Sequence, residues 1–139
     1  MNTAPQPLEV VLVVDIANVM GSRPDGWWRD RAAAATRLLS LLGPVKGVEV
    51  SVPANPGRVR ISDVRAVLEG QARRAEGPEQ VSILRADRDG DTAVVEEAER
   101  LTATGRTPLV VTADRGLRDR LPAPALVVGP RWLNRLLGR

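Results

Sequence analysis

Two apolar runs in this chain each end on an aspartate. Val10 to Val14 precede Asp15, and the run that starts at Leu109 ends on Asp114. A continuous apolar run of this length is typical of a strand buried on both faces, as in a parallel sheet covered by helices. In such open sheets, ligands bind beyond the carboxyl ends of the strands. The two runs therefore favour a helix-covered parallel sheet and predict a carboxylate-lined site at one edge of it.

Helical patterns alternate with further strand-like runs, which indicates right-handed βαβ units. The predicted fold class is α/β, a three-layer α/β/α sandwich with a central, mostly parallel sheet. With 139 residues, 43% of them hydrophobic, the chain has enough apolar material for one core, so we expect a flexible tail over 1–7 and a single domain over 8–139. Strands are predicted over 9–14, 64–68, 81–84, 109–112 and 125–128, with the middle of a helix as the alternative for 64–68. Helices are predicted over 27–42, 91–104 and 115–120 and from Pro130 onward. The region 44–62 is predicted to be either an edge hairpin or a long loop.

The absence of cysteine and histidine restricts the chemistry of the chain. Thiolate nucleophiles, thiolate metal sites and imidazole acid–base catalysis are all excluded. A purely oxygen ligand set favours a hard cation, Mg²⁺ or Mn²⁺, over zinc or copper. The glycine-rich phosphate loop, the dinucleotide fingerprint and the G-x-S-x-G nucleophile motif are also missing, which makes a small nucleotide-binding or phosphotransfer domain the weakest of three functional hypotheses.

The charge balance is compatible with a polyanionic partner. The formal net charge is +3, and all but one of the 20 basic residues are arginine, which matches phosphate bidentately. Coding bias toward arginine and alanine explains the same composition, so charge alone does not select a nucleic acid. There is no apolar run long enough for a membrane span and no signal-peptide pattern, so we expect a cytoplasmic protein without membrane contact.

A third aspartate, Asp91, stands at the start of the predicted 91–104 helix on its core-facing side. Asp15, Asp91 and Asp114 would then converge at the sheet edge, where carboxylates so close repel one another unless a divalent cation compensates them. Such a cation supports phosphodiester hydrolysis. The competing interpretation is that Asp91 caps its helix while the other two form turns.

Four neighbouring residues are candidates for substrate contacts. Asn18 follows Asp15 and can contact a phosphate or a water, although turn formation explains it equally. The hydroxyl of Thr112 can bond a carboxylate or a phosphate. Arg115 and Arg118 are candidates for phosphate binding, with solvated helix surface as the alternative.

Other acidic and aromatic residues are assigned structural roles. Asp87 and Asp89 are interpreted as loop residues, one of which can join the site, and Glu96 and Glu97 as helix surface. In a chain without Phe or Tyr, tryptophan supplies the aromatic packing. Core positions are therefore predicted for Trp28 and Trp132, whereas Trp27, close to Asn18, can be packed or can stack on an exposed base.

Three ordered motifs, Val14-Asp15-Ile16-Ala17-Asn18-Val19, Gly90-Asp91-Thr92-Ala93-Val94-Val95 and Val111-Thr112-Ala113-Asp114-Arg115-Gly116-Leu117-Arg118, resemble the NYN domain family of the PIN-like nuclease superfamily. The segment from Gly21 to Arg31 is also similar to small actinobacterial-type members. The resemblance implies a PIN-like fold and an Mg²⁺- or Mn²⁺-dependent ribonuclease. Asp15, Asp91 and Asp114 would be its metal ligands, and Asn18 would assist them.

The chain departs from the family pattern at two positions. Ile16 stands where the family often has glycine, and Thr92 where it often has a second acidic residue. These departures motivate the second hypothesis, a catalytically weak or inactive RNA-binding or interaction module of the same fold. RNA is the expected partner in both cases, and a homodimer is one option for assembly.

Overall fold

The computed structural model describes residues 6–139; most of the predicted tail, residues 1–5, lies outside them. Gln6 and Pro7 have no regular structure and lead into the first strand. Six strands form one sheet in the order β2-β3-β1-β5-β6, with β4 also paired to β3. The strands are β1 (Leu8–Asp15), β2 (Glu49–Val52), β3 (Asn55–Leu68), β4 (Val81–Arg85), β5 (Pro108–Val111) and β6 (Leu126–Val128).

Every strand pairing is parallel except that of β2 with β3. The long β3 therefore resolves the ambiguous region of the sequence: its first half closes an antiparallel edge hairpin with β2, and its second half pairs with β4. The predicted inner strand over 64–68 is confirmed, because it is the carboxyl-terminal part of β3.

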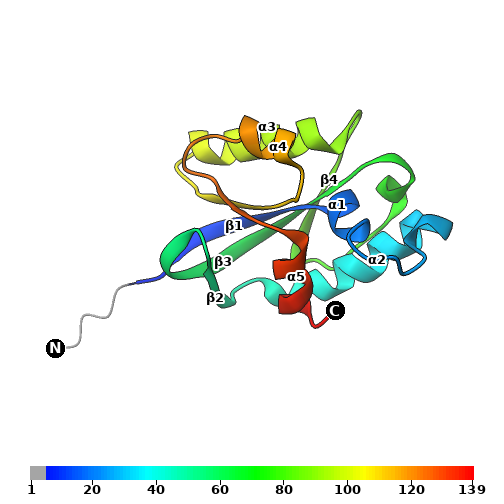
Figure 1. Cartoon of the computed structure of the whole chain (residues 1–139), viewed down its shortest axis with the longest axis horizontal. Helices are drawn as coiled ribbons and strands as arrows, with labels where there is room; N and C mark the ends of the chain where they lie inside the picture. Colours follow the sequence, from blue (N-terminus) through cyan, green and yellow to red (C-terminus); the bar gives the residue numbers. More distant parts are fainter. Residues whose placement is uncertain (1–5) are drawn as a thin grey trace.

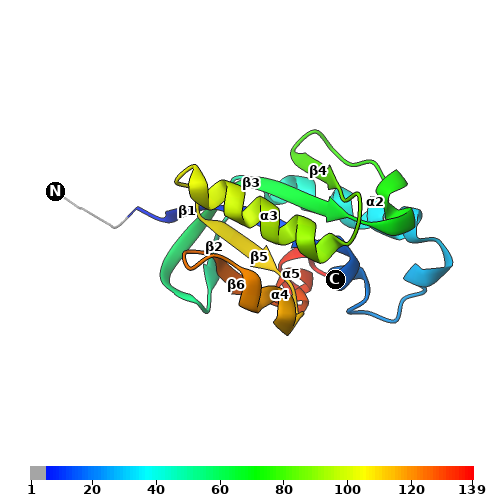
Figure 2. The same cartoon turned by 90° about the horizontal axis from the view of Figure 1, so that it is seen from above.

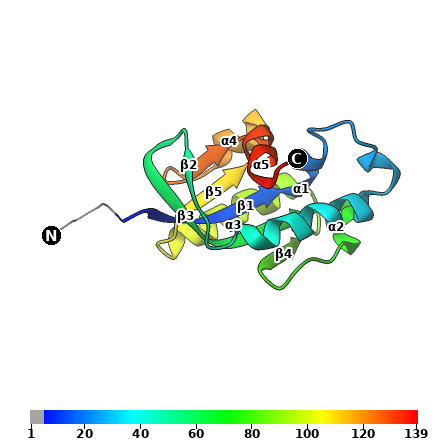
Figure 3. The same cartoon turned by 90° about the horizontal axis from the view of Figure 1, so that it is seen from below.

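Helices cover both faces of the sheet, which confirms the predicted three-layer α/β/α class. In Figure 1 the helices α3 and α4 lie above the sheet while α1, α2 and α5 lie below it, and Figures 2 and 3 show these two faces in turn. None of the helices within 6–139 is long and apolar enough to span a membrane. The helices are α1 (Ile16–Met20), α2 (Arg31–Leu42), α3 (Gly90–Ala103), α4 (Arg115–Arg120) and α5 (Pro130–Leu137), with short 3-10 turns at Trp27–Arg29, Gly43–Val45 and Gly70–Arg74.

The alternation of side chains along β1 divides the core into two clusters. Val10, Leu12 and Val14 join the larger cluster on the α2 face, and Val11 and Val13 join the smaller one on the α3 face. Successive strand residues point to opposite faces, so both faces of a central strand must be apolar to be covered by helices. Asp15, the next odd-numbered residue, is therefore directed toward the α3 face.

The predicted 27–42 helix is wrong at its start. Asp30 interrupts it with an extended backbone and caps α2, accepting a hydrogen bond from the Ala33 N–H at 3.0 Å. The break separates the two tryptophans from the helix, so the core position predicted for Trp28 is also wrong: its side chain is 50% exposed. Trp27 packs partly against the larger core cluster instead, as does Trp132.

The surface position predicted for Glu97 is wrong as well, whereas Glu96 is exposed as predicted. Glu97 is only 6% exposed and accepts a hydrogen bond from Arg65 Nη1 at 2.7 Å and another from Arg100 Nε at 2.9 Å. Arg65 stands on the α3 face of β3, so burial of Glu97 is compensated by a cation from the sheet. Helical phase alone does not show whether a charged side chain has a partner on another element that allows it to be buried.

Candidate carboxylate site at the sheet edge

Asp15 is the last residue of β1 and lies almost entirely inside the protein, with 3% exposure. One carboxylate oxygen accepts a hydrogen bond from the Asn18 N–H at 3.4 Å and so caps α1; the other accepts one from the Thr112 hydroxyl at 3.4 Å. In the parallel register Val14 is paired with Val111, so Thr112 is the next residue along beside Asp15. The carboxylate is thus held between two chain segments at the carboxyl ends of β1 and β5.

Asp91 lies in the first turn of α3, but it does not cap that helix. The cap is Asp89, whose carboxylate accepts a hydrogen bond from the Thr92 N–H at 2.7 Å. The predicted alternative role for Asp91 is therefore wrong, whereas Asp89 lies in the loop before α3, as predicted, and caps that helix. Because Asp89 caps the helix, the carboxylate of Asp91 is left to face the sheet edge.

Asp114 caps α4 and shares a short loop with Thr112. It accepts a hydrogen bond from the Leu117 N–H at 3.0 Å, and its own N–H donates to the Thr112 hydroxyl at 3.2 Å. Asn18 braces the same loop, because its side-chain oxygen accepts a hydrogen bond from the Ala113 N–H at 2.8 Å. Asn18 therefore links the segment after β1 to the segment after β5, and the turn role weighed for it is replaced by this long-range contact.

Glu69 is a fourth carboxylate of the site and was not among the predicted residues. It follows β3 directly, and its Oε2 accepts a hydrogen bond from the Gly90 N–H at 2.7 Å. Val67 joins the cluster on the α3 face, so alternation directs Glu69, two residues later, to the same face. The signal was present in the sequence, since Glu69 ends an apolar run just as Asp15 does.

The electrostatics of the site place these four carboxylates in one cluster. Burial is the largest cause that raises the pKa of Asp15 to about 6, and the charges of Asp91 and Glu69 add to it. The pKa of Asp91 is also raised, first by burial, then by the charge of Asp114 and a hydrogen bond with its side chain, and then by Glu69. Burial and the neighbouring carboxylates thus disfavour the charged forms of Asp15 and Asp91.

The donor set suits a hard divalent cation, although no all-protein cage is formed. Within residues 6–139, no group of three or more aspartate or glutamate side chains is placed to hold one metal ion. Mg²⁺ is usually held by only one or two carboxylates, with waters and substrate phosphates completing the shell. Oxygen donors with raised pKa values fit that mode of binding, because a cation stabilises the charged form that burial and the neighbouring carboxylates disfavour.

The arginines predicted to contact phosphate differ from those that line a cavity. Arg115 and Arg118 are exposed on α4. A cavity of about 550 Å³ opens instead beside Ala113, and four arginines line it, from the segment after α1 and from α5 and its carboxyl-terminal end. Burial, followed by the positive charge of Arg23, lowers the pKa of one of them, Arg139. The cavity is lined by Ser22, Arg23, Ala113, Pro130, Arg131, Asn134, Arg135 and Arg139.

The two departures from the family pattern have different structural meanings. Ile16 begins α1, and its side chain is fully buried in the larger core cluster. No residue other than glycine within 6–139 has a positive φ, so position 16 does not require glycine's conformational freedom. Thr92 is partly exposed and accepts a hydrogen bond from Arg120 Nη2 at 3.4 Å, so it contributes a hydroxyl where a carboxylate would add charge.

The fold is a three-layer α/β/α sandwich with acidic residues gathered at the carboxyl ends of its strands. No protein-family profile and no curated protein sequence matches the chain. Among solved structures, Rae1 (YacP) from Bacillus subtilis, crystallised as a tryptophan-to-leucine mutant, is similar to it with a TM-score of 0.65. The match covers 93% of this chain and 75% of that one at 19% sequence identity, so it establishes the fold alone.

Proposed function

We propose that this chain is a metal-dependent ribonuclease of the NYN type, in which one or two carboxylates of the cluster Asp15, Glu69, Asp91 and Asp114 ligate Mg²⁺ or Mn²⁺ directly and the others bind it through water. The observation that carries the proposal is the convergence of four carboxylates, from the ends of β1 and β3 and the starts of α3 and α4, around a buried Asp15 whose pKa is raised to about 6. When bound, the cation neutralises these carboxylates, polarises the phosphodiester and activates water for attack.

The remaining residues of the site orient the carboxylates. Thr112 donates its hydroxyl hydrogen to Asp15 and accepts one from the Asp114 N–H, so it fixes the relative position of the two ligands. Asn18 holds the intervening Ala113 N–H. Each ligand carboxylate therefore starts from a defined position, which is what precise positioning of a scissile phosphate requires.

RNA is the proposed substrate, and the arginine-lined cavity beside Ala113 supports it. Like charges at close range, as at Arg139 and Arg23, are relieved by an anion, and guanidinium groups match phosphate oxygens bidentately. We propose that this cavity binds the backbone of the strand next to the cleaved bond. The exposed Arg115 and Arg118 on α4 remain further candidates. The cytoplasm remains the expected location and homodimerisation an option for assembly.

The test is cleavage of single-stranded and structured RNA by the purified protein with Mg²⁺, with Mn²⁺ and with a chelator. The parent protein should cleave only with metal, and Asp15→Asn should lose at least a hundredfold in rate. Asp119→Asn is the matched control, because Asp119 is an exposed aspartate on α4 outside the cluster. Mn²⁺ titration by calorimetry gives a readout independent of turnover. Cleavage by Asp15→Asn at the parent's rate would refute the proposal.

A catalytically weak or inactive RNA-binding module is the second candidate, favoured by Thr92 at the position of a second carboxylate. In that case the protein binds RNA with equal affinity in Mg²⁺ and in chelator, and Asp15→Asn does not reduce the binding. Restoring a carboxylate with Thr92→Asp distinguishes the two functions further. The ribonuclease proposal predicts stronger metal binding or faster turnover for this variant, whereas the second candidate predicts neither.

A further inference from the structure

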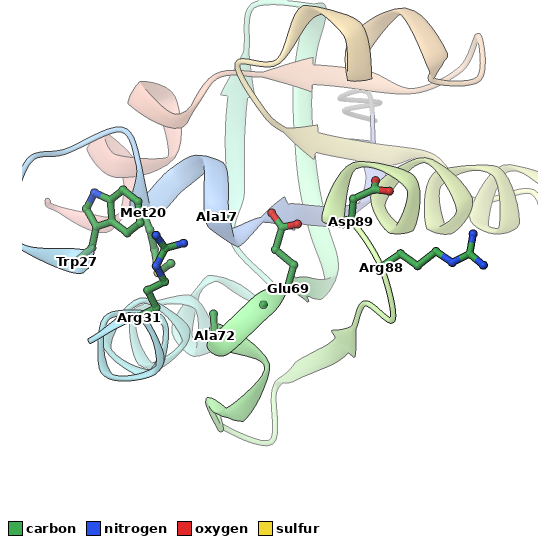
Figure 4. A pocket seen from close by; sticks show the side chains of 9 residues that line it. Ala17, Met20, Trp27, Arg31, Glu69, Ala72, Arg88 and Asp89 are labelled. Atoms are coloured by element: carbon green, nitrogen blue, oxygen red, sulfur yellow. The ribbon is translucent and has the colours of Figure 1, made fainter. Parts of the chain in front are cut away.

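A second cavity, of about 560 Å³, adjoins the carboxylate site on the side away from the arginine-lined cavity. Glu69 belongs to both the site and this cavity, because it lines the cavity and also shapes the electrostatics of Asp15. Figure 4 shows Trp27, Met20 and Arg31 on one side, Arg88 and Asp89 on the other, and Glu69 between them. The volume lies within the range of small-ligand sites.

Trp27 is the aromatic wall of this cavity. Its ring is partly buried against the core, and the Arg31 guanidinium carbon lies 5.0 Å from the ring centroid. Within residues 6–139, Arg31 forms no ion pair, so its charge is directed to the ring and the cavity instead of to a carboxylate. Trp28 meets Trp27 edge-on with centroids 5.9 Å apart, is half exposed, and does not line the cavity.

This combination matches the chemistry of a nucleobase. A base has a flat π face, which stacks on an aromatic ring or a guanidinium plane, and an edge of donors and acceptors. The cavity supplies Trp27 and Arg31 for the face, and the carboxylate of Glu69, which lies in the middle of Figure 4, as an acceptor for the edge. The cavity adjoins the place where the phosphodiester would bind, so the base of a nucleotide next to the scissile phosphate would reach it.

We infer that the Trp27 cavity binds one unpaired nucleobase next to the scissile phosphate, an inference that rests on the proposed function. Trp27 and Arg31 are then residues that determine specificity. A base inside a duplex must leave its stack to enter such a cavity, and that costs free energy that an unpaired base does not pay. The protein therefore prefers single-stranded or looped RNA to duplex RNA.

The test measures binding rather than cleavage, in the Asp15→Asn background with Mg²⁺ present. A short labelled single-stranded RNA is compared with the same strand carrying one abasic nucleotide, placed in turn at each position. Replacing Trp27 with leucine keeps apolar volume but removes the aromatic face, and should weaken binding of the intact strand about tenfold. Trp27→Phe should restore most of the affinity, and Trp28→Leu is the matched control that should leave it within twofold.

The abasic strand supplies the second criterion. At one position of the strand, removal of the base should weaken binding to the protein that keeps Trp27 about as much as Trp27→Leu weakens binding of the intact strand. The same abasic strand should bind the Trp27→Leu protein almost as well as the intact strand does. Equal binding by Trp27→Leu and the parent, or an equal abasic penalty in both, overturns the inference. Nucleoside monophosphates that compete with an affinity equal to that of the RNA strand would show that the cavity binds free nucleotides. That result would also overturn the inference.

A single-tryptophan protein reports on the cavity directly. With Trp28 and Trp132 replaced by phenylalanine, only Trp27 fluoresces, and single-stranded RNA should quench it more than duplex RNA of the same sequence. Equal quenching by both would contradict the inference. Failure of the ribonuclease proposal is recognised separately, as the absence of metal-dependent cleavage by the parent protein, and it leaves these binding results readable because the RNA stays intact.

Discussion

Replacing Asp15 with asparagine is expected to stabilise the metal-free protein at neutral pH while abolishing its activity. Burial raises the pKa of Asp15 from its ordinary value of 3.8 to about 6. The folded state therefore binds the proton more tightly than the unfolded state, and the free energy of unfolding falls as the pH rises from about 4 to about 6. Above that window the charged carboxylate costs up to about 3 kcal/mol.

Asparagine keeps the shape of this residue and removes the charge. Its oxygen can accept the Asn18 N–H, and its amide can donate to the Thr112 hydroxyl in place of the present bond. Burial of the polar amide offsets part of the free energy that is gained by removing the charge. At pH 7.5 Asp15→Asn should then be about 2 kcal/mol more stable than the parent, or about 7 °C higher in Tm for a chain of this length.

Urea unfolding of both proteins in chelator, at intervals from pH 4 to pH 8, measures this difference. It should be near zero at pH 4 and reach its full value above pH 6. Saturating Mg²⁺ should reduce it, because the cation stabilises only the carboxylate form. A variant less stable than the parent at pH 7.5, or a difference that does not vary with pH, would refute the reasoning.

Two further predictions concern buried carboxylates, one away from the proposed metal site and one within it. Glu97→Ala should cost about 2 kcal/mol in urea unfolding, because it removes a buried carboxylate that Arg65 and Arg100 share and leaves Arg65 with Asp63 alone. Glu96→Ala on the same helix should stay within about 0.5 kcal/mol, and equal costs would contradict the buried ion pair. Gly90→Ala places a Cβ 3.0 Å from the Glu69 carboxyl carbon and so displaces that carboxylate. The affinity for Mn²⁺, measured by calorimetry, should fall about tenfold without loss of stability. An unchanged affinity would show that Glu69 does not belong to the metal site.

The sequence predicted most elements of this fold because their patterns are local and repetitive. The apolar runs before Asp15 and Asp114 needed burial on both faces, and that requirement is met only in a helix-covered sheet. The short β4, β5 and β6 and the helix α4 lie within a residue or two of their predicted bounds. The boundary that failed, the start of α2, depends on one capping side chain, Asp30.

The candidate site could be predicted only in part. The sequence located Asp15, Asp91 and Asp114 by their places at strand and helix ends, and the structure brings them into electrostatic contact. The sequence offered Glu69 only as the end of an apolar run, because its part in the site comes from the pairing of β3 beside β1 and from its bond to Gly90, 21 residues later. It also misplaced the charge of Glu97, whose partner comes from another element.

Composition and local pattern thus determined the class of the chain by themselves. The missing histidine and cysteine limit any metal chemistry to oxygen ligands, and the two apolar runs limit the fold to a covered parallel sheet. Tertiary structure decided which side chains meet. Trp27 rather than Trp28 packs beside the site, and Asn18 holds a loop 95 residues away. Local periodicity sets the face of an element, but only the packing of distant segments sets which faces and charges become neighbours.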